Sequence, residues 1–148
     1  MKGLDGELVK RVLNSFINQT IVIMKDKIEK FEDLKIWQDS VTIAVEIYAL
    51  FKDSKDFGFR DQIQRSSVSI PSNIAEGYDR QSNNEFIRFL RIAKASCAEL
   101  RTQIIIAQRV GMVHDVTNLI ERTKSLSAMI QKLITYRDGL RGRERVGR

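Results

Sequence analysis

Apolar residues recur along most of the chain at alternating spacings of three and four positions, the period of one face of an α-helix. The first run in the body of the chain begins at Leu34 and stops before the polar segment KDSKDFG, residues 52–58. This run carries two neighbouring stripes, Leu34, Trp37, Val41, Ala44, Tyr48 and Phe51 in one and Ile36, Ile43, Ile47 and Leu50 in the other. The pattern predicts a first helix, followed by a connection at residues 52–58.

The next stretch, QIQRSSVSIPSNIAEG at residues 62–77, contains the only proline of the chain. A proline inside a helix costs about 3 kcal/mol because it removes one backbone hydrogen bond and crowds the preceding turn. The serines at 66, 67, 69 and 72 can bond to nearby carbonyls or admit water. Because Ile63, Ile70 and Ile74 keep their helical spacing through Pro71, we predict a bent but continuous helix, with two separate pieces as the alternative.

The boundaries of the later helices have local signals. The second helix is expected to begin near Phe59 and to end at Gly77, since glycine readily takes the left-handed conformation of a helix end. Ser82, with Glu85 three residues later, forms a capping-box pattern that predicts the start of a third helix. Gly111 is expected to close that helix, and Asp115 is a candidate cap for a fourth.

The third and fourth predicted helices have the most regular apolar seams. The third seam consists of Phe86, Leu90, Ala93, Cys97, Leu100, Ile104, Ala107 and Gly111, and the fourth of Val116, Leu119, Thr123, Leu126, Ile130, Leu133 and Arg137. Their spacing is typical of helices packed almost in parallel or antiparallel. Four helices with short connections predict an all-α fold, an antiparallel up-down-up-down four-helix bundle over residues 31–137.

Two terminal segments flank this predicted bundle. Residues 1–30 form an N-terminal extension that can hold an extra amphipathic helix starting at Asp5, although Met24 is an alternative start of the natural product. Residues 138–148 form a basic C-terminal tail.

Residue usage argues against several classes of chemistry. One cysteine and one histidine are too few for a disulfide framework or a zinc cluster, and they favour a reducing, cytoplasmic setting. No apolar stretch is long enough to span a membrane. The chain has no nucleophile elbow, Walker loop or Glu-x-x-His pair, so we expect no catalytic residue, metal or cofactor. Cys97 is expected to be a small buried residue and His114 a surface or capping one.

Positive charge is unevenly distributed along the chain. Its formal net charge is +6, with an acidic predicted first helix, a basic third helix and an arginine-rich end. The candidate phosphate-binding residues are Arg80, Arg88, Arg91, Lys94, Arg137, Arg141, Arg143, Arg145 and Arg148. A solvated helix face is the alternative interpretation of the cations on the third helix.

A polar stripe also runs along the predicted second helix. It consists of Gln62, Arg65, Ser69, Asn73 and Glu76, in a segment that also carries Pro71 and Gly77. The spacing leaves open whether this stripe meets water, a neighbouring subunit or a phosphate chain.

The segments FEDLKIWQDS (31–40), QIQRSSVSIPSNIAEG (62–77) and NEFIRFLRIAKASCAELRTQI (84–104), followed by AQRVGMV, resemble a known family in order and spacing. These are the four-helix-bundle proteins encoded in intervening sequences of bacterial 23S ribosomal RNA genes. The resemblance covers about residues 31–136 and implies a homopentameric ring without enzymatic activity. It also implies similarity to the accessory variability determinant of diversity-generating retroelements, a basic pentameric bundle that binds nucleic acid and a reverse transcriptase.

The chain has more apolar residues than one stripe per helix requires. The predicted third helix adds Ile87, Phe89, Ile92, Ile105 and Ile106, and the first adds its second stripe. Apolar surface of this extent favours homo-oligomerisation, and a wider core or packing under the N-terminal segment is the alternative. We therefore expect a non-enzymatic oligomer that binds RNA or DNA electrostatically, with a protein-interaction scaffold as the alternative function.

Overall fold

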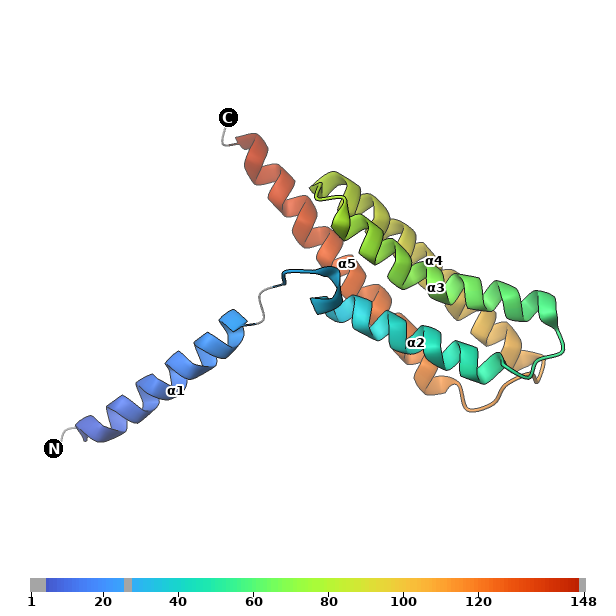
Figure 1. Cartoon of the computed structure of the whole chain (residues 1–148), viewed down its shortest axis with the longest axis horizontal. Coiled ribbons are helices and arrows are strands. Elements are labelled where there is room, and N and C mark those ends of the chain that lie inside the picture. The colour runs from blue at the N-terminus through green and yellow to red at the C-terminus, as the bar shows by residue number, and fades with distance from the viewer. Residues whose placement is uncertain (1–4, 26–27, 147–148) are drawn as a thin grey trace.

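The computed structural model describes the backbone of residues 5–25 and 28–146, and the side chains of residues 5–15 and 28–142. Within these ranges the chain forms five α-helices and one short 3-10 helix, with no strand, so the fold is all-α (Figure 1). The elements are α1 (Gly6–Lys25), η1 (Phe31–Asp33), α2 (Lys35–Phe51), α3 (Phe57–Asp79), α4 (Asn83–Arg109) and α5 (Thr117–Val146).

Helices α2 to α5 pack around one hydrophobic core, and we call these four helices the helical body. α2 contacts α3 and α5, α3 contacts α4, and α4 contacts α5, while successive helices run in opposite directions (Figure 1). The third seam is buried from Phe86 to Ala107, as its period predicts. Ile47, Ile63, Ile104 and Ile130 are fully buried, so each helix contributes to the same core.

The extra apolar residues divide between core and surface. Ile36, Ile43 and Ile47 of the second α2 stripe are buried, and so are Ile87 and Phe89 of α4. For these five residues the alternative of a wider core is confirmed, so they do not supply the apolar surface that was expected to favour homo-oligomerisation. The physical reason is that α2 and α4 each contact two neighbouring helices, so each must bury a broader arc than one seam. Leu50, Ile92 and Ile106 are exposed, and so is Tyr48 of the first α2 stripe.

Helix α3 is continuous through Pro71, as predicted, and the proline side chain is buried. Ser66 and Ser67 donate hydrogen bonds to the carbonyls of Ile63 and Gln64 at 3.0 and 2.7 Å. These bonds to nearby carbonyls are the local pattern expected around the proline.

The prediction that Gly77 ends this helix is wrong, because α3 continues to Asp79. A Cβ atom at Gly77 would lie 2.5 Å from the Cβ of Phe89, so the glycine allows α3 to pass close to α4. The left-handed residue after the helix is Gln81, with a φ of 54°. Tertiary contact, and not helix termination, therefore explains the glycine.

Helix α4 begins and ends at its predicted signals. The Ser82 hydroxyl accepts a hydrogen bond from the Glu85 amide at 3.4 Å, which confirms Ser82 as the N-cap. At the other end Gly111 has a φ of 79°, and its amide and that of Met112 donate to the carbonyls of Gln108 and Ala107. This is the Schellman arrangement of a helix C-terminus.

Asp115 is not the cap of the last helix. α5 begins at Thr117, so the N-cap position belongs to Val116, whose carbonyl accepts from the Ile120 amide at 2.9 Å. Asp115 instead has a left-handed φ of 53° in the connection between α4 and α5. α5 then continues to Val146, so residues 138–146 of the expected tail are helical.

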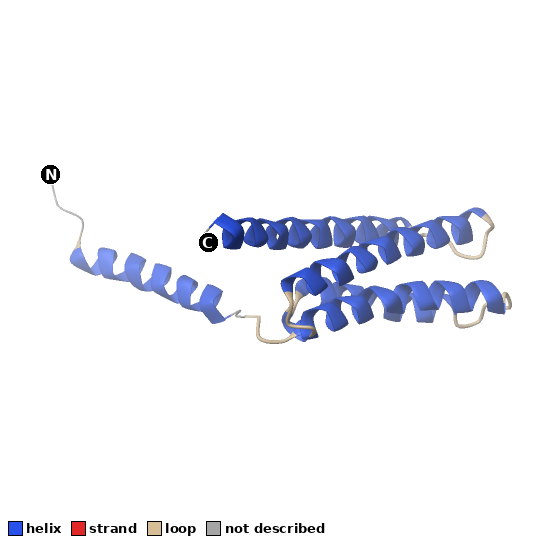
Figure 2. Cartoon of the chain, turned by 90° about the horizontal axis from the view of Figure 1, so that it is seen from above, coloured by secondary structure: helices blue, strands red, loops and turns tan. Residues whose placement is uncertain are grey.

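Helix α1 extends away from the helical body in both views (Figures 1 and 2). Asp5 caps it, because its carboxylate accepts from the Glu7 amide at 3.2 Å. The apolar side chains of Leu8, Val9, Val12 and Leu13 are exposed. Among the described residues, no helix has a stretch both long and apolar enough to cross a bilayer.

Candidate nucleic-acid interface

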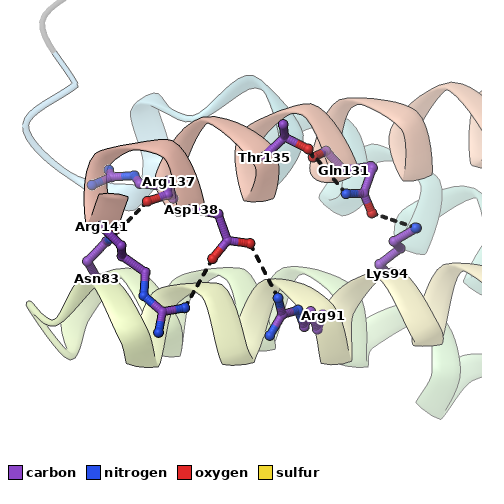
Figure 3. Close-up of polar contacts among 8 residues, drawn as sticks. All are labelled: Asn83, Arg91, Lys94, Gln131, Thr135, Arg137, Asp138 and Arg141. Carbon is purple, nitrogen blue, oxygen red and sulfur yellow. Dashed lines mark hydrogen bonds and ion pairs between the residues drawn. The ribbon is translucent and has the colours of Figure 1, made fainter. Parts of the chain in front are cut away.

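Cations of α4 and α5 meet along the line where these two helices pack (Figure 3). Arg91 of α4 donates to the carboxylate of Asp138 on α5 at 3.3 Å, and Arg141 donates to the same carboxylate at 3.1 Å. Lys94 donates to the side-chain oxygen of Gln131 at 2.7 Å. The antiparallel packing of α4 on α5 therefore brings residues from the two helices into one polar surface.

Two further cations lie around the ring of Phe89. The guanidinium carbons of Arg80 and Arg88 are 5.3 and 4.6 Å from the ring centroid, a favourable cation–π distance. Arg88 also donates two hydrogen bonds to Glu85, at 3.0 and 3.2 Å. These bonds hold the pKa of the Glu85 carboxyl below its usual value and raise the pKa of the guanidinium.

We call this set of cations the basic face. It consists of Arg80, Arg88, Arg91, Lys94, Arg137 and Arg141. Arg80 pairs with Glu76, Arg88 with Glu85, and Arg91 and Arg141 share Asp138. Among the described side chains, three carboxylates therefore pair with four of the six cations, which leaves an excess of positive charge.

The basic face ends at a polar pocket of about 670 Å³. Arg137 and Arg141 line it from α5, and Ser82, Asn83 and Asn84 line it from the start of α4. The Asn83 side-chain amide donates to the Arg137 carbonyl at 3.0 Å (Figure 3). Asn83 thus joins the first residue of α4 to the C-terminal part of α5.

The structure does not describe the side chains of the three predicted cations nearest the C-terminus. Arg143 and Arg145 lie on α5, but their side chains are outside the described residues, as is the whole of Arg148. Gln131, Asp138 and Asn83 were not predicted from the sequence to belong to this surface. The only feature of the sequence that indicated a role for them was the polar composition of α5 around Arg137. That composition does not by itself show which residues face α4.

The polar stripe of α3 is divided between solvent and α4. The Ser69 hydroxyl lies 2.9 Å from the Ser96 hydroxyl, and Asn73 donates to the Ser69 carbonyl and hydroxyl at 2.7 and 3.0 Å. Gln62 and Arg65 are exposed. The exposed carboxylate of Glu76 pairs with Arg80 at 2.8 Å. The middle of the stripe therefore belongs to an intramolecular contact.

Ser96 and Gln103 are buried polar residues of α4 that were not predicted from the sequence. The Ser66 hydroxyl lies at hydrogen-bond distance from the Gln103 side-chain amide, and Ser69 contacts Ser96. The sequence feature that could have indicated their role is their spacing of seven residues beside an apolar seam, which places both on one face of the helix. These hydrogen bonds satisfy polar groups that the packing of α3 on α4 removes from water.

Other reactive groups are not assembled into a site. Cys97 is buried, and burial raises the pKa of its thiol to about 12, so it is a poor nucleophile at neutral pH. His114 is exposed and lines a separate pocket of about 440 Å³ between α2 and α5. In the described part of the chain, no group of three or more potential ligands is placed to hold a metal ion.

Comparison with known proteins gives two similarities. A model of the 23S rRNA-intervening sequence protein family matches residues 32–132. A crystal structure of a protein of unknown function from the S23 ribosomal protein family of Bacteroides thetaiotaomicron has a TM-score of 0.55 and 29% sequence identity. The similarity covers 67% of this chain and 94% of that one. No curated protein matches the chain.

Proposed function

Because the chain belongs to the 23S rRNA-intervening sequence protein family, we propose that it is a non-enzymatic cytoplasmic protein that binds nucleic acid through its basic face. The contacts are made to phosphates, so binding is electrostatic and weakly dependent on sequence. The family name connects its members with 23S rRNA, and structured RNA is therefore the first ligand to test.

The excess of cations over carboxylates on the basic face is the observation that carries this proposal. Asp138 divides one negative charge between Arg91 and Arg141, and Lys94 has a neutral partner, Gln131. The Arg91 side chain is 61% exposed, and exposed ion pairs contribute only about 0–1 kcal/mol. A phosphate can therefore replace or join these contacts at low cost.

The proposal includes an assembled form of the protein. We propose that the helical body is a four-helix bundle and that copies associate as a homo-oligomer, a pentamer by the resemblance stated above. Exposed apolar residues on α2 and α4, including Tyr48 and Ile106, support self-association. Symmetry would then repeat the basic face and increase its affinity for a long polyanion by avidity.

The first test is a titration of the full chain with duplex DNA and structured RNA at several salt concentrations. We expect affinity to fall steeply with salt, with a log–log slope of about −0.9 per neutralised phosphate on duplex DNA. Lys94→Gln should weaken binding to all sequences alike and reduce the slope by about 1. Lys124→Gln is the control, because Lys124 is an exposed lysine outside the basic face and pairs with Glu121 on α5.

Absence of binding at about 50 mM salt would contradict the proposal. An equal loss of affinity in Lys94→Gln and Lys124→Gln would show that total charge matters and that the basic face is not the site.

The second candidate function is a protein-interaction scaffold. Four cations of the basic face already pair with carboxylates of this chain. Carboxylates of another protein would fit the same guanidinium groups, and this favours the scaffold. The resemblance of the sequence motifs to the accessory variability determinant makes a reverse transcriptase the first protein partner that we propose to test.

Charge reversal separates the two candidates. If Arg88→Glu with Arg91→Glu dissociates the oligomer in light scattering, the cations serve subunit or partner pairing. If the double variant keeps its mass and loses nucleic acid, the basic face is the nucleic-acid site.

A further inference from the structure

The pocket at the end of the basic face is built from segments far apart in the sequence. Asn83 and Asn84 come from the first turn of α4, Arg137 and Arg141 from the C-terminal part of α5, and Tyr78 from the last turn of α3. Among the described residues that line it, Glu29 is the one carboxylate. Its volume of about 670 Å³ lies in the range of small-molecule sites, roughly 300–1,000 Å³.

The two arginines give this pocket a positive potential. Within the described residues no ion pair involves Arg137, whose guanidinium carbon lies 5.1 Å from the centroid of the Phe86 ring. Arg141 shares the carboxylate of Asp138 with Arg91, so its own charge is only partly compensated. The side chains of Arg137 and Arg141 thus supply guanidinium donors suited to oxygen anions.

Two buried polar atoms beside the pocket have no partner. The side-chain oxygen of Asn83 and Nε of Arg137 are inaccessible to solvent and make no hydrogen bond among the described residues. Native structures rarely leave such atoms unsatisfied, because a buried polar group without a hydrogen bond lowers stability. Both atoms belong to residues that line the same pocket, so its wall holds polar groups whose hydrogen-bonding capacity is not used within the described residues.

The first turn of α4 adds donors on another side. The amides of Asn83 and Asn84 occupy the first two helical positions and have no acceptor inside the helix. The Ser82 hydroxyl is already occupied by the Glu85 amide, so it does not satisfy them. The positive end of the helix dipole also favours a negative group at this point.

From these observations we propose that the pocket binds a phosphate monoester, such as the 5′-phosphate at the end of an RNA strand. A monoester has three terminal oxygens and nearly two negative charges, which suits donors that converge from α4 and α5 and outweighs the single carboxylate of Glu29. An internal phosphodiester has one charge and a chain on both sides. The volume leaves room for the attached nucleoside.

Binding of the 5′-phosphate at the end of an RNA strand rests on the proposed function, because it requires that the protein binds RNA. Binding of a free phosphate monoester does not rest on it. The test therefore uses two RNA oligonucleotides of one sequence, with a 5′-phosphate or a 5′-hydroxyl, together with a nucleoside 5′-monophosphate and inorganic phosphate. Isothermal titration measures their affinities for the full chain. Thermal unfolding in phosphate and in chloride of equal ionic strength measures stabilisation by the anion alone.

We expect the 5′-phosphorylated RNA to bind about fivefold or more tightly than the 5′-hydroxyl RNA. Phosphate should also raise the unfolding midpoint above its value in chloride. Asn84→Asp should abolish both effects, because it places a negative charge beside the pocket. Its folding should be preserved, since an acidic residue is favourable in the first turn of a helix.

The matched control is Asn118→Asp. Asn118 is exposed and occupies the second position of α5, the position that Asn84 occupies in α4. The first turns of the antiparallel helices α4 and α5 lie at opposite ends of the pair (Figure 1), so the same charge change in α5 should leave the preference for 5′-phosphate intact.

The outcomes distinguish the two proposals. Equal affinity for the two RNAs, with no stabilisation by phosphate or the monophosphate, overturns the pocket while leaving binding on the basic face intact. Loss of the preference in Asn118→Asp as well as Asn84→Asp also overturns it. Binding of the monophosphate without binding of either RNA supports the pocket, identifies a free nucleotide as the source and contradicts the proposed function.

Discussion

At the scale of single residues, Gly77 connects helix packing to the basic face. The missing side chain allows α3 to approach Phe89 of α4. The guanidinium groups of Arg80 and Arg88 both lie within cation–π distance of the same Phe89 ring. The positions of Arg80 and Arg88 therefore depend on a close contact between α3 and α4, and the only sign of this contact in the sequence is a glycine.

Gly77→Ala should lower the free energy of unfolding by about 1–3 kcal/mol, because the new Cβ would overlap Phe89 and neither helix backbone can move freely. Gly139→Ala is the matched control on α5. Apart from the adjoining backbone of α5, no described heavy atom lies within 4 Å of a Cβ built there, so the gain in helix propensity should stabilise the protein by up to about 1 kcal/mol. Chemical denaturation followed by circular dichroism measures both changes, and equal stability of the two variants would refute this account of Gly77.

At the scale of elements, α3 shows how a helix with an internal proline remains intact. Ile70 and Ile74 on either side of Pro71 are fully buried, so both halves of the helix are anchored in the core. Ser69 and Asn73 hydrogen-bond within α3 and to α4. Tertiary packing thus offsets the local cost of the proline.

Helix caps should contribute to stability only where the capped helix packs. Ser82→Ala removes the N-cap of α4 and should lower the stability of the helical body by about 1 kcal/mol. Asp5→Ala removes the cap of α1, which has no contact with α2–α5 among the described residues. Thermal unfolding should therefore show a lower midpoint for Ser82→Ala and an unchanged one for Asp5→Ala. A comparable shift in both variants would mean that α1 unfolds together with the body.

At the scale of the whole molecule, the apolar surface that remains exposed bears on assembly. Val45 is 64% exposed and lies one turn from the exposed Tyr48 on α2. Val68 on α3 is also exposed, but Arg65 and Ser72 are its exposed neighbours on that helix. The α2 residues thus form a small apolar patch, whereas Val68 is isolated.

Val45→Glu should reduce the molar mass in light scattering to that of a monomer, because a buried charge would be left unpaired at the contact. Its helical content should be retained, since glutamate has a higher helix propensity than valine. Val68→Glu introduces the same charge outside the patch and should leave the mass unchanged. An oligomer that survives Val45→Glu would exclude this patch from the interface.

Local signals in the sequence were sufficient for much of the secondary structure. The period of the apolar residues predicted α2 to α5, and Ser82 and Gly111 marked both ends of α4, because caps act within a few residues of the chain. The same local reasoning failed for Gly77, where a long-range contact has the same sequence signature as a helix end.

The sequence by itself determined the helices and the cations available for a basic face, since both depend on residue type and short-range spacing. Only the tertiary structure decided how these parts combine. Arg91 meets Asp138 across 47 positions and Asn83 meets Arg137 across 54, and such contacts exist only once α4 packs against α5. The division of α2 between core and surface, the charge balance of the face and the pocket at its end all depend on which helices become neighbours.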